Sequence, residues 1–298
     1  MVSDRESREF NLERGTKQGD PMSSALFNAV LESIMRDLKS KWKKERLGFK
    51  MGSHTLTNLR FADDILLFGT SRAQVRRMLK YLDERARAAG LKLHMGKTKI
   101  LSNEADRRGV LRQKDVQVGE GRVEVLACGD STPYLGRQLT FREYHDVEIN
   151  HRISRGWAAF GKFKTELCNR HYLLQSIFKL FDAVVSSTVL YGSGAWTLTA
   201  AREQKLNATM RKMLRKIVAV SRIEEESYVD WIVRATRRAE EEYSRAGLPT
   251  WLQAQSVRKA SLCHKLQSCS DQRWGQVALR WIPSGYRSIG RPPKRWTD

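Results

Sequence analysis

Two neighbouring aspartates, Asp63 and Asp64, stand between two apolar runs that are typical of β-strands. The first run, residues 56–61, reads LTNLRF, and the second, residues 65–69, reads ILLFG. So short a separation predicts a β-hairpin with both carboxylates at its turn. Like charges held close together raise each other's pKa unless a cation neutralises them, and Mg²⁺ prefers oxygen ligands of this kind. The hairpin therefore indicates a divalent-cation site, although an Asp-Asp pair taken alone is more often an ordinary turn.

A glycine-containing loop and a helix are expected before this hairpin. Residues 14–21 read RGTKQGDP, and the glycines allow backbone conformations that other residues resist. Apolar residues then recur every three or four positions from Leu26 to Trp42. This spacing predicts an amphipathic helix of about five turns.

A second helix and two short strands are expected after the hairpin. Ser71 can cap the start of a helix, and Gly90 suits its end. Residues 91–93 and 98–101 have the composition of short strands. Residues 1–140 are therefore predicted to form a mixed unit of helices and an antiparallel sheet.

The apolar residues of the segment 141–247 keep helical spacing, which predicts that this segment contains helices alone. The predicted fold class is therefore α+β. Residues 248–298 are expected to form a basic, partly ordered tail. Its tryptophans can stack on unpaired bases, although packing in a core is the more frequent use; they are Trp251, Trp274, Trp281 and Trp296.

The charge of the chain indicates a polyanionic partner. The sequence holds 54 Lys and Arg against 33 Asp and Glu, a net charge of +21 over 298 residues. Residues 151–298 hold 26 of the basic residues but only 12 of the acidic ones, so most of the excess lies there. Solubility alone rarely needs such an excess, and we expect nucleic-acid binding that weakens with salt.

Other classes of protein are disfavoured by the composition. Four cysteines without a CxxC pair do not make a disulfide framework or begin a zinc site. The charged start lacks the apolar run of a signal peptide, and polar residues interrupt the uncharged stretch at 183–201. We therefore expect no membrane association and an intracellular location, in the cytoplasm, the nucleus or both.

The order of these segments resembles the reverse transcriptases of non-LTR (LINE-type) retrotransposons. Residues 14–23 are similar to motif B of that family, Phe61-Ala62-Asp63-Asp64 to motif C, residues 90–99 to motif D, and Tyr134-Leu135-Gly136 to motif E. Further along, residues 191–196 (YGSGAW) resemble a Tyr-Gly-x-x-x-Trp segment of the family's helical thumb. Residues 290–298 resemble the tail of RTE-type elements, so the resemblance covers nearly the whole chain.

The resemblance implies a role for each matching residue. Asp63 would hold the catalytic Mg²⁺ or Mn²⁺ ions, and Asp64 would assist in the same site. Lys97 or Lys99 would face the triphosphate, unless these lysines are only solvated charges at a strand edge. The remaining implied contacts are Arg14, Gln18 and Gly19 with the incoming nucleotide and template, Tyr134, Leu135 and Gly136 as primer grip, and Arg291, Lys294 and Arg295 with nucleic acid.

The sequence departs from the family in what precedes the glycine loop. The family has a metal-binding aspartate of motif A upstream, whereas this chain has only Asp4 there, in no matching setting. We therefore expect the second half of a polymerase palm with its thumb and tail, lacking the fingers and motif A and inactive by itself. A smaller departure is His94, where the family more often has asparagine.

Two functions remain open on the sequence alone. The first is a segment of an RNA-directed DNA polymerase that acts on an RNA template, a DNA primer and deoxynucleoside triphosphates. The second is a non-catalytic remnant that keeps only nucleic-acid binding. Because Asp63 and Asp64 are both present, the sequence favours descent from a working enzyme.

Overall fold

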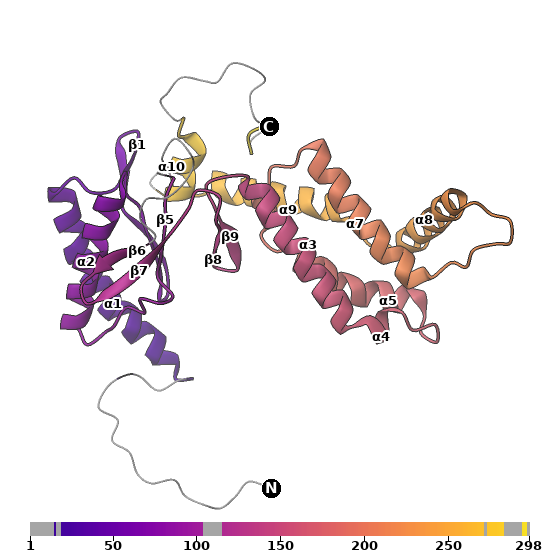
Figure 1. Ribbon diagram of the computed structural model, residues 1–298, viewed down its shortest axis with the longest axis horizontal. Helices are drawn as coiled ribbons and strands as arrows, with labels where there is room; N and C mark the ends of the chain where they lie inside the picture. The colour runs from indigo at the N-terminus through magenta and orange to yellow at the C-terminus, as the bar shows by residue number, and fades with distance from the viewer. Residues whose placement is uncertain (1–14, 16–18, 104–114, 271–272, 283–293, 297–298) are drawn as a thin grey trace, which may run out of the picture. The chain divides into compact units, whose positions relative to one another are not determined.

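The computed structural model describes residues 15, 19–103, 115–270, 273–282 and 294–296 (Figure 1). The chain divides into two compact units, Met1–Asp130 and Ser131–Asp298. The first unit combines small sheets with two helices, and the second is mostly helical. The predicted α+β class is therefore confirmed.

Two amphipathic helices form one layer of the first unit. Helix α1, Pro21–Lys44, begins where the Asp20 side chain accepts a hydrogen bond from the Met22 amide. Helix α2, Arg72–Ala88, is capped by Ser71 and followed by Gly90, whose φ is +75°. Both helices were predicted from apolar spacing, and they pack against each other.

The strands of the first unit form two hairpins and a three-stranded sheet. The hairpins are β1 with β2, Phe49–Met51 and His54–Leu56, and β3 with β4, Asn58–Phe61 and Asp64–Leu67. The third sheet has the order β5-β7-β6, in which β5 runs parallel to β7. Its strands are Lys99–Leu101, Asp115–Val118 and Gly121–Leu126.

The strand expected at residues 91–93 is absent from the described residues, and this prediction was wrong. The Leu91 amide instead donates to the Ala86 carbonyl at the end of α2. Leu91 and Leu93 pack against the core of the unit from an irregular segment. Their apolar alternation reflects this one-sided packing rather than pairing with another strand.

The core of the first unit lies between the helices and the sheet of β5 to β7. Leu38, Trp42 and Met78 of the helices are at most 1% exposed. They belong to one hydrophobic cluster with Val118 and Val123 of the sheet. The helical stripe is not buried along its whole length, however. At the start of α1 the side chains of Met22, Leu26 and Val30 are 65%, 50% and 43% exposed.

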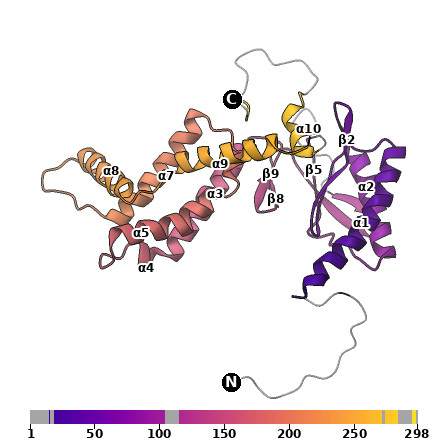
Figure 2. The same cartoon turned by 180° about the vertical axis from the view of Figure 1, so that it is seen from behind.

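The second unit begins with a short hairpin and continues as helices (Figure 2). The hairpin pairs β8, Thr132–Tyr134, with β9, Arg137–Leu139. The Asp182–Ser186 segment is a π-helical turn, η1, and Ser193–Ala195 is a 3-10 turn, η2. The α-helices are α3, Tyr144–Lys162; α4, Lys164–Leu167; α5, Leu174–Phe181; α6, Ser187–Val189; α7, Ala200–Val218; α8, Tyr228–Arg245; α9, Trp251–Gln267; and α10, Trp274–Arg280.

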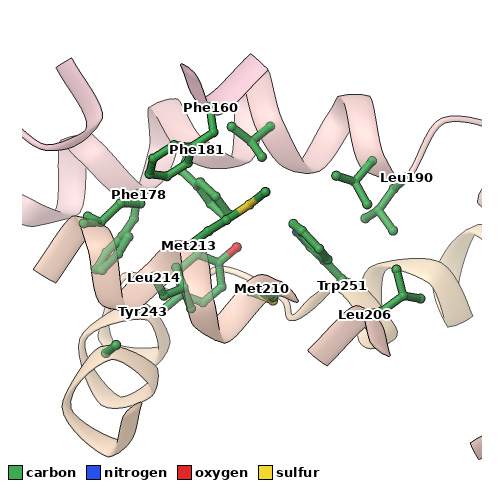
Figure 3. Packing of buried hydrophobic residues seen from close by; sticks show 14 of the residues in the cluster. Phe160, Phe178, Phe181, Leu190, Leu206, Met210, Met213, Leu214, Tyr243 and Trp251 are labelled. Carbon is green, nitrogen blue, oxygen red and sulfur yellow. The ribbon is translucent and has the colours of Figure 1, made fainter. Parts of the chain in front are cut away.

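Helix α9 begins inside the region expected to be a basic tail, and it belongs to the helical core. Trp251 is fully buried, its ring stacks on Phe181 at 6.3 Å between centroids, and its indole N–H donates to the Ser186 hydroxyl at 2.8 Å. Figure 3 shows Trp251 with Met213 and Tyr243 in this cluster. The structure thus differs from the expected boundary at residue 248, because an indole of this size gains more from burial than from exposure.

None of the described helices is long and apolar enough to cross a lipid bilayer.

Candidate active site

The β3–β4 hairpin places Asp63 and Asp64 at its tip. Phe61 pairs with Asp64, so Ala62 and Asp63 are the two turn residues, and the predicted hairpin is confirmed. Ala62 has a φ of +51°, which L-residues other than glycine rarely adopt. Such strain at a tip is compatible with a functional turn, because the paired strands hold it in place. Both aspartates are exposed.

The two faces of this hairpin differ. Paired residues of an antiparallel ladder share a face, and successive residues alternate between faces. Ile65 and Leu67 pack against the core, so Asp64 lies on the opposite face together with its pairing partner Phe61, which is 66% exposed. The carboxylate therefore stands on an open face beside apolar side chains.

The core face of the hairpin is attached to α1 by an ion pair. The Arg60 guanidinium lies 2.6 Å from the Glu32 carboxylate. This hydrogen bond holds the pKa of Glu32 below its usual value. Because Arg60 lies on β3, one residue before Phe61, the pair fixes the hairpin just below its acidic tip.

The two aspartates alone are an incomplete set of metal ligands. In the part of the chain that the structure describes, no group of three or more His, Cys, Asp and Glu is arranged to hold a metal ion. Mg²⁺ is commonly bound by one or two carboxylates with substrate phosphates and water completing the octahedron. An exposed Asp-Asp pair fits that pattern, because its open side can accept phosphate, water or a further carboxylate.

The glycine loop before α1 is described only in part. Gly19 has a φ of +91°, and a Cβ added there would meet no atom within 4 Å. Backbone conformation, rather than lack of space, therefore requires glycine at this position. Arg14 and Gln18 lie outside the described residues.

The two candidate lysines after α2 have different surroundings. The Lys99 ammonium forms an ion pair with Glu124 across the β5–β7 pair. Lys97 is exposed in the preceding turn. In that turn the His94 ring nitrogen Nδ1 accepts a hydrogen bond from the Lys97 amide at 3.2 Å. His94 thus shapes the turn as an asparagine side chain can, which explains why it is tolerated there.

The 134–136 turn lies in the second unit, between β8 and β9. Leu135 and Gly136 have φ values of +47° and +74°, as a type I′ hairpin turn requires at both positions. Three residues of the helical region form hydrogen bonds to this hairpin: Glu148, Arg152 and Tyr191. The sequence pattern did not predict this role for any of them. The only local signal was the four-residue spacing of Glu148 and Arg152.

The tail residues proposed to contact nucleic acid are partly engaged within the protein. The Lys294 ammonium donates to the Leu198 carbonyl at 2.9 Å, and the Trp296 indole N–H donates to the Gly194 carbonyl at 2.8 Å. Arg295 is exposed between them. Arg291 lies outside the described residues.

Known proteins are similar to this chain over these segments. Residues 1–139 match the family model of the reverse transcriptase (RNA-dependent DNA polymerase). A transposon-derived protein of Caenorhabditis elegans is 28% identical over 260 residues, which cover 84% of this chain and 85% of that protein. The Pol polyprotein of the type-2 retrotransposable element R2DM of Drosophila melanogaster is 33% identical over 137 residues, 45% of this chain and 12% of that protein.

A second polyprotein extends the similarity into the helical unit. The Pol polyprotein of a type-1 retrotransposable element R2 of Popillia japonica is 31% identical over 223 residues. These cover 73% of this chain and 34% of that protein. The chain therefore spans about a third or less of the two polyproteins.

The residues matched by the family model contain all four of the motif-like segments. They are the glycine loop, the Asp63-Asp64 hairpin, residues 90–99 and the 134–136 turn. Residues 1–139 are therefore similar to the reverse transcriptase (RNA-dependent DNA polymerase) family, and the chain is related to the proteins of non-LTR retrotransposable elements.

Proposed function

We propose that this chain supplies the Asp63-Asp64 carboxylates and the primer-holding turn of an RNA-directed DNA polymerase of an RTE-like non-LTR retrotransposon. The carrying observation is the exposed pair of aspartates at the strained tip of the β3–β4 hairpin, within the segment matched by the family. The substrates are an RNA template, a DNA primer and deoxynucleoside triphosphates, in line with the net charge of +21.

In this proposal Asp63 and Asp64 hold Mg²⁺ or Mn²⁺. Such a cation lowers the pKa of an attacking hydroxyl and neutralises charge on the transferred phosphate. The strand pairing of the hairpin holds the two aspartates at the turn, and the Arg60–Glu32 ion pair joins β3 to α1. Phe61 contributes an exposed apolar surface beside Asp64 on which a base or sugar can pack. The ammonium group of Lys97 can contact a phosphate of the substrate, because Lys97 lies exposed in a turn.

The same proposal requires a further carboxylate from an upstream segment. The described residues provide no third ligand beside the two aspartates. The exposed apolar residues Met22, Leu26 and Val30 repeat every four positions along α1, which is the pattern of a helix face that packs against another element. We infer that a segment carrying the fingers and motif A covers this face, and that the chain alone does not polymerise DNA.

Primer extension on an RNA template tests this function. The chain is joined to the upstream reverse-transcriptase segment of the Popillia japonica polyprotein and assayed with Mg²⁺ and then with a chelator. We expect metal-dependent extension that Asp63→Ala abolishes and Asp64→Ala reduces, because in this proposal Asp63 is the main protein ligand of the metal and Asp64 only assists it. Asp115→Ala, an exposed carboxylate on β6, is the matched control and should leave extension unchanged.

Two results would contradict the proposal. Wild-type extension by the Asp63→Ala protein would refute the metal assignment, and efficient extension by the chain without the added segment would refute its incompleteness. A joined protein that binds the hybrid but extends nothing would favour the second candidate, a nucleic-acid-binding remnant. This second candidate is supported by the finding that the described residues provide only two carboxylates, and no third ligand, for a metal ion at the hairpin.

A further inference from the structure

The turn at Leu135 and Gly136 is held by a buried carboxylate on α3. Glu148 is 0% exposed. One of its oxygens accepts the Gln138 amide of β9 at 2.7 Å, and the other accepts the Arg152 Nε–H at 2.7 Å. A single side chain of α3 therefore binds both the backbone of the hairpin and the arginine that reaches its turn.

Arg152 and Tyr191 bind the two carbonyls of the turn itself. The Arg152 guanidinium donates to the Gly136 carbonyl and lies 4.5 Å from the centre of the Tyr191 ring. The Tyr191 hydroxyl donates to the Leu135 carbonyl at 3.0 Å. The Tyr191 ring also lies beside Gly136, where an added Cβ would meet it at 3.4 Å.

These contacts determine which way the Leu135–Gly136 peptide faces. In a trans peptide the C=O and N–H groups point in opposite directions. Because the Leu135 carbonyl is bound by Tyr191, the Gly136 N–H points away from Tyr191, and Gly136 is exposed. The turn thus presents a backbone N–H group, a common ligand of nucleic-acid phosphates.

A buried ion pair is a costly way to stabilise a fold. Apolar residues of similar size often do so equally well, because the charges lose their hydration. The Glu148–Arg152 pair provides what apolar packing cannot, since it binds peptide groups in fixed directions. Tyr191 is 50% exposed, so its hydroxyl contributes little to the core. The network is therefore better suited to orienting the turn than to stabilising the unit.

We propose that Tyr191, Arg152 and Glu148 are positioning residues that orient the Leu135–Gly136 peptide so that its N–H binds a phosphate of the primer strand. This inference rests on the proposed function, in which the turn contacts the primer. It also gives a role to the Tyr191-Gly192 pair of the YGSGAW segment. Gly192 has a φ of +68°, and a Cβ there would meet the Arg137 side chain of β9 at 3.3 Å.

The test measures single phosphate contacts with the full chain. RNA–DNA hybrids are prepared in which one primer phosphate at a time is a neutral methylphosphonate, and each Kd is measured by fluorescence anisotropy. We expect one phosphate near the primer 3′ end whose neutralisation weakens wild-type binding about tenfold, as for a hydrogen bond to a charged group. In Tyr191→Phe the same neutralisation should weaken binding by about twofold or less, because the peptide is no longer oriented.

Tyr191→Phe keeps the ring over Arg152 and removes only an exposed hydroxyl, so we expect an unchanged Tm. Tyr228→Phe, at another exposed tyrosine, is the matched control and should retain the wild-type phosphate profile. Arg152→Lys, which keeps the charge but not the guanidinium geometry, should give the Tyr191→Phe profile.

The outcomes separate the two proposals. If Tyr191→Phe keeps the full sensitivity of the wild type at that phosphate, the positioning inference is wrong while the primer contact stands. If no primer phosphate is sensitive in the wild type, the turn does not hold the primer, and the proposed function fails at this site. A profile that Tyr228→Phe changes as much as Tyr191→Phe would also refute the inference, because the effect would not be specific to the turn.

Discussion

His145, at the start of α3, has a buried ring in a positively charged setting. His145 is 7% exposed, and the centres of the His145 and Tyr144 rings lie 3.7 Å apart. The Thr197 amide donates to the Nδ1 atom of His145 at 3.5 Å. Burial, followed by the charges of Arg202 and Arg137, lowers the pKa of His145 to about 4. His145 is therefore neutral in the folded protein near pH 7.

The low pKa of His145 predicts loss of stability in mild acid. The unfolded chain takes up this proton near pH 6.5 and the folded chain only near pH 4. The contribution of neutral His145 to the free energy of unfolding is therefore fully present above about pH 6.5. It falls by up to about 3 kcal/mol as the pH drops to 4. Urea unfolding at several pH values measures this, and His145→Gln should flatten the profile over this range.

The matched control for this prediction is His171→Gln, which removes an exposed histidine. It should keep the wild-type pH dependence. An NMR titration that gives His145 an ordinary pKa near 6.5 would contradict the prediction.

Among the secondary-structure elements, α3 and α6 pack closely because Gly156 has no side chain. A Cβ added at Gly156 would lie 2.3 Å from Val189 Cγ2, and Val189 is fully buried. Gly161, near the end of the same helix, has open space instead. The two glycines of α3 thus have opposite roles, one required by packing and one replaceable.

Gly156→Ala should destabilise the helical unit by roughly 1–3 kcal/mol through overpacking. Combining it with Val189→Ala should recover part of this loss, because the clash is with the removed methyl groups. Gly161→Ala should instead raise stability by up to about 1 kcal/mol, since alanine favours helix. Denaturant unfolding of Gly156→Ala, Val189→Ala and the double variant gives the coupling between the two changes, with Gly161→Ala measured beside them. Additive effects of Gly156→Ala and Val189→Ala would contradict the close packing.

At the scale of the whole molecule, each unit has its own hydrophobic core. Trp251 lies in the cluster of the second unit, and Trp42 lies in that of the first. The boundary expected at residue 248 does not coincide with the end of the helical core, because α9 contacts α7 and η2. Removal of residues 248–298 would therefore remove part of that core.

Trp251→Ala should destabilise the second unit by about 3–5 kcal/mol, the usual cost of truncating a large buried aromatic residue. Hydrogen exchange measured by mass spectrometry should show faster exchange in α5 and α7 and unchanged exchange in α1. Trp274→Ala, at the partly buried start of α10, should have a smaller effect. Unchanged protection of α7 in Trp251→Ala would show that the indole is not part of the core.

Local features were predictable from the sequence because they depend on neighbouring residues. The β3–β4 hairpin follows from two β-type runs separated by a short acidic segment, and α1 and α2 follow from apolar spacing and their caps. The local pattern alone therefore placed the candidate aspartates correctly at a turn. The strand expected at residues 91–93 was wrong because one-sided apolar packing has the same local pattern as pairing.

By itself, the sequence determined the hairpin that carries Asp63 and Asp64, the helical periodicity and the positive charge. Only the tertiary structure decided which distant residues support these features. Tyr191 bonds to Leu135 across 56 positions, and Trp251 bonds to Ser186 across 65. Local composition cannot specify such contacts, since they arise only when the packing of several helices brings the side chains together.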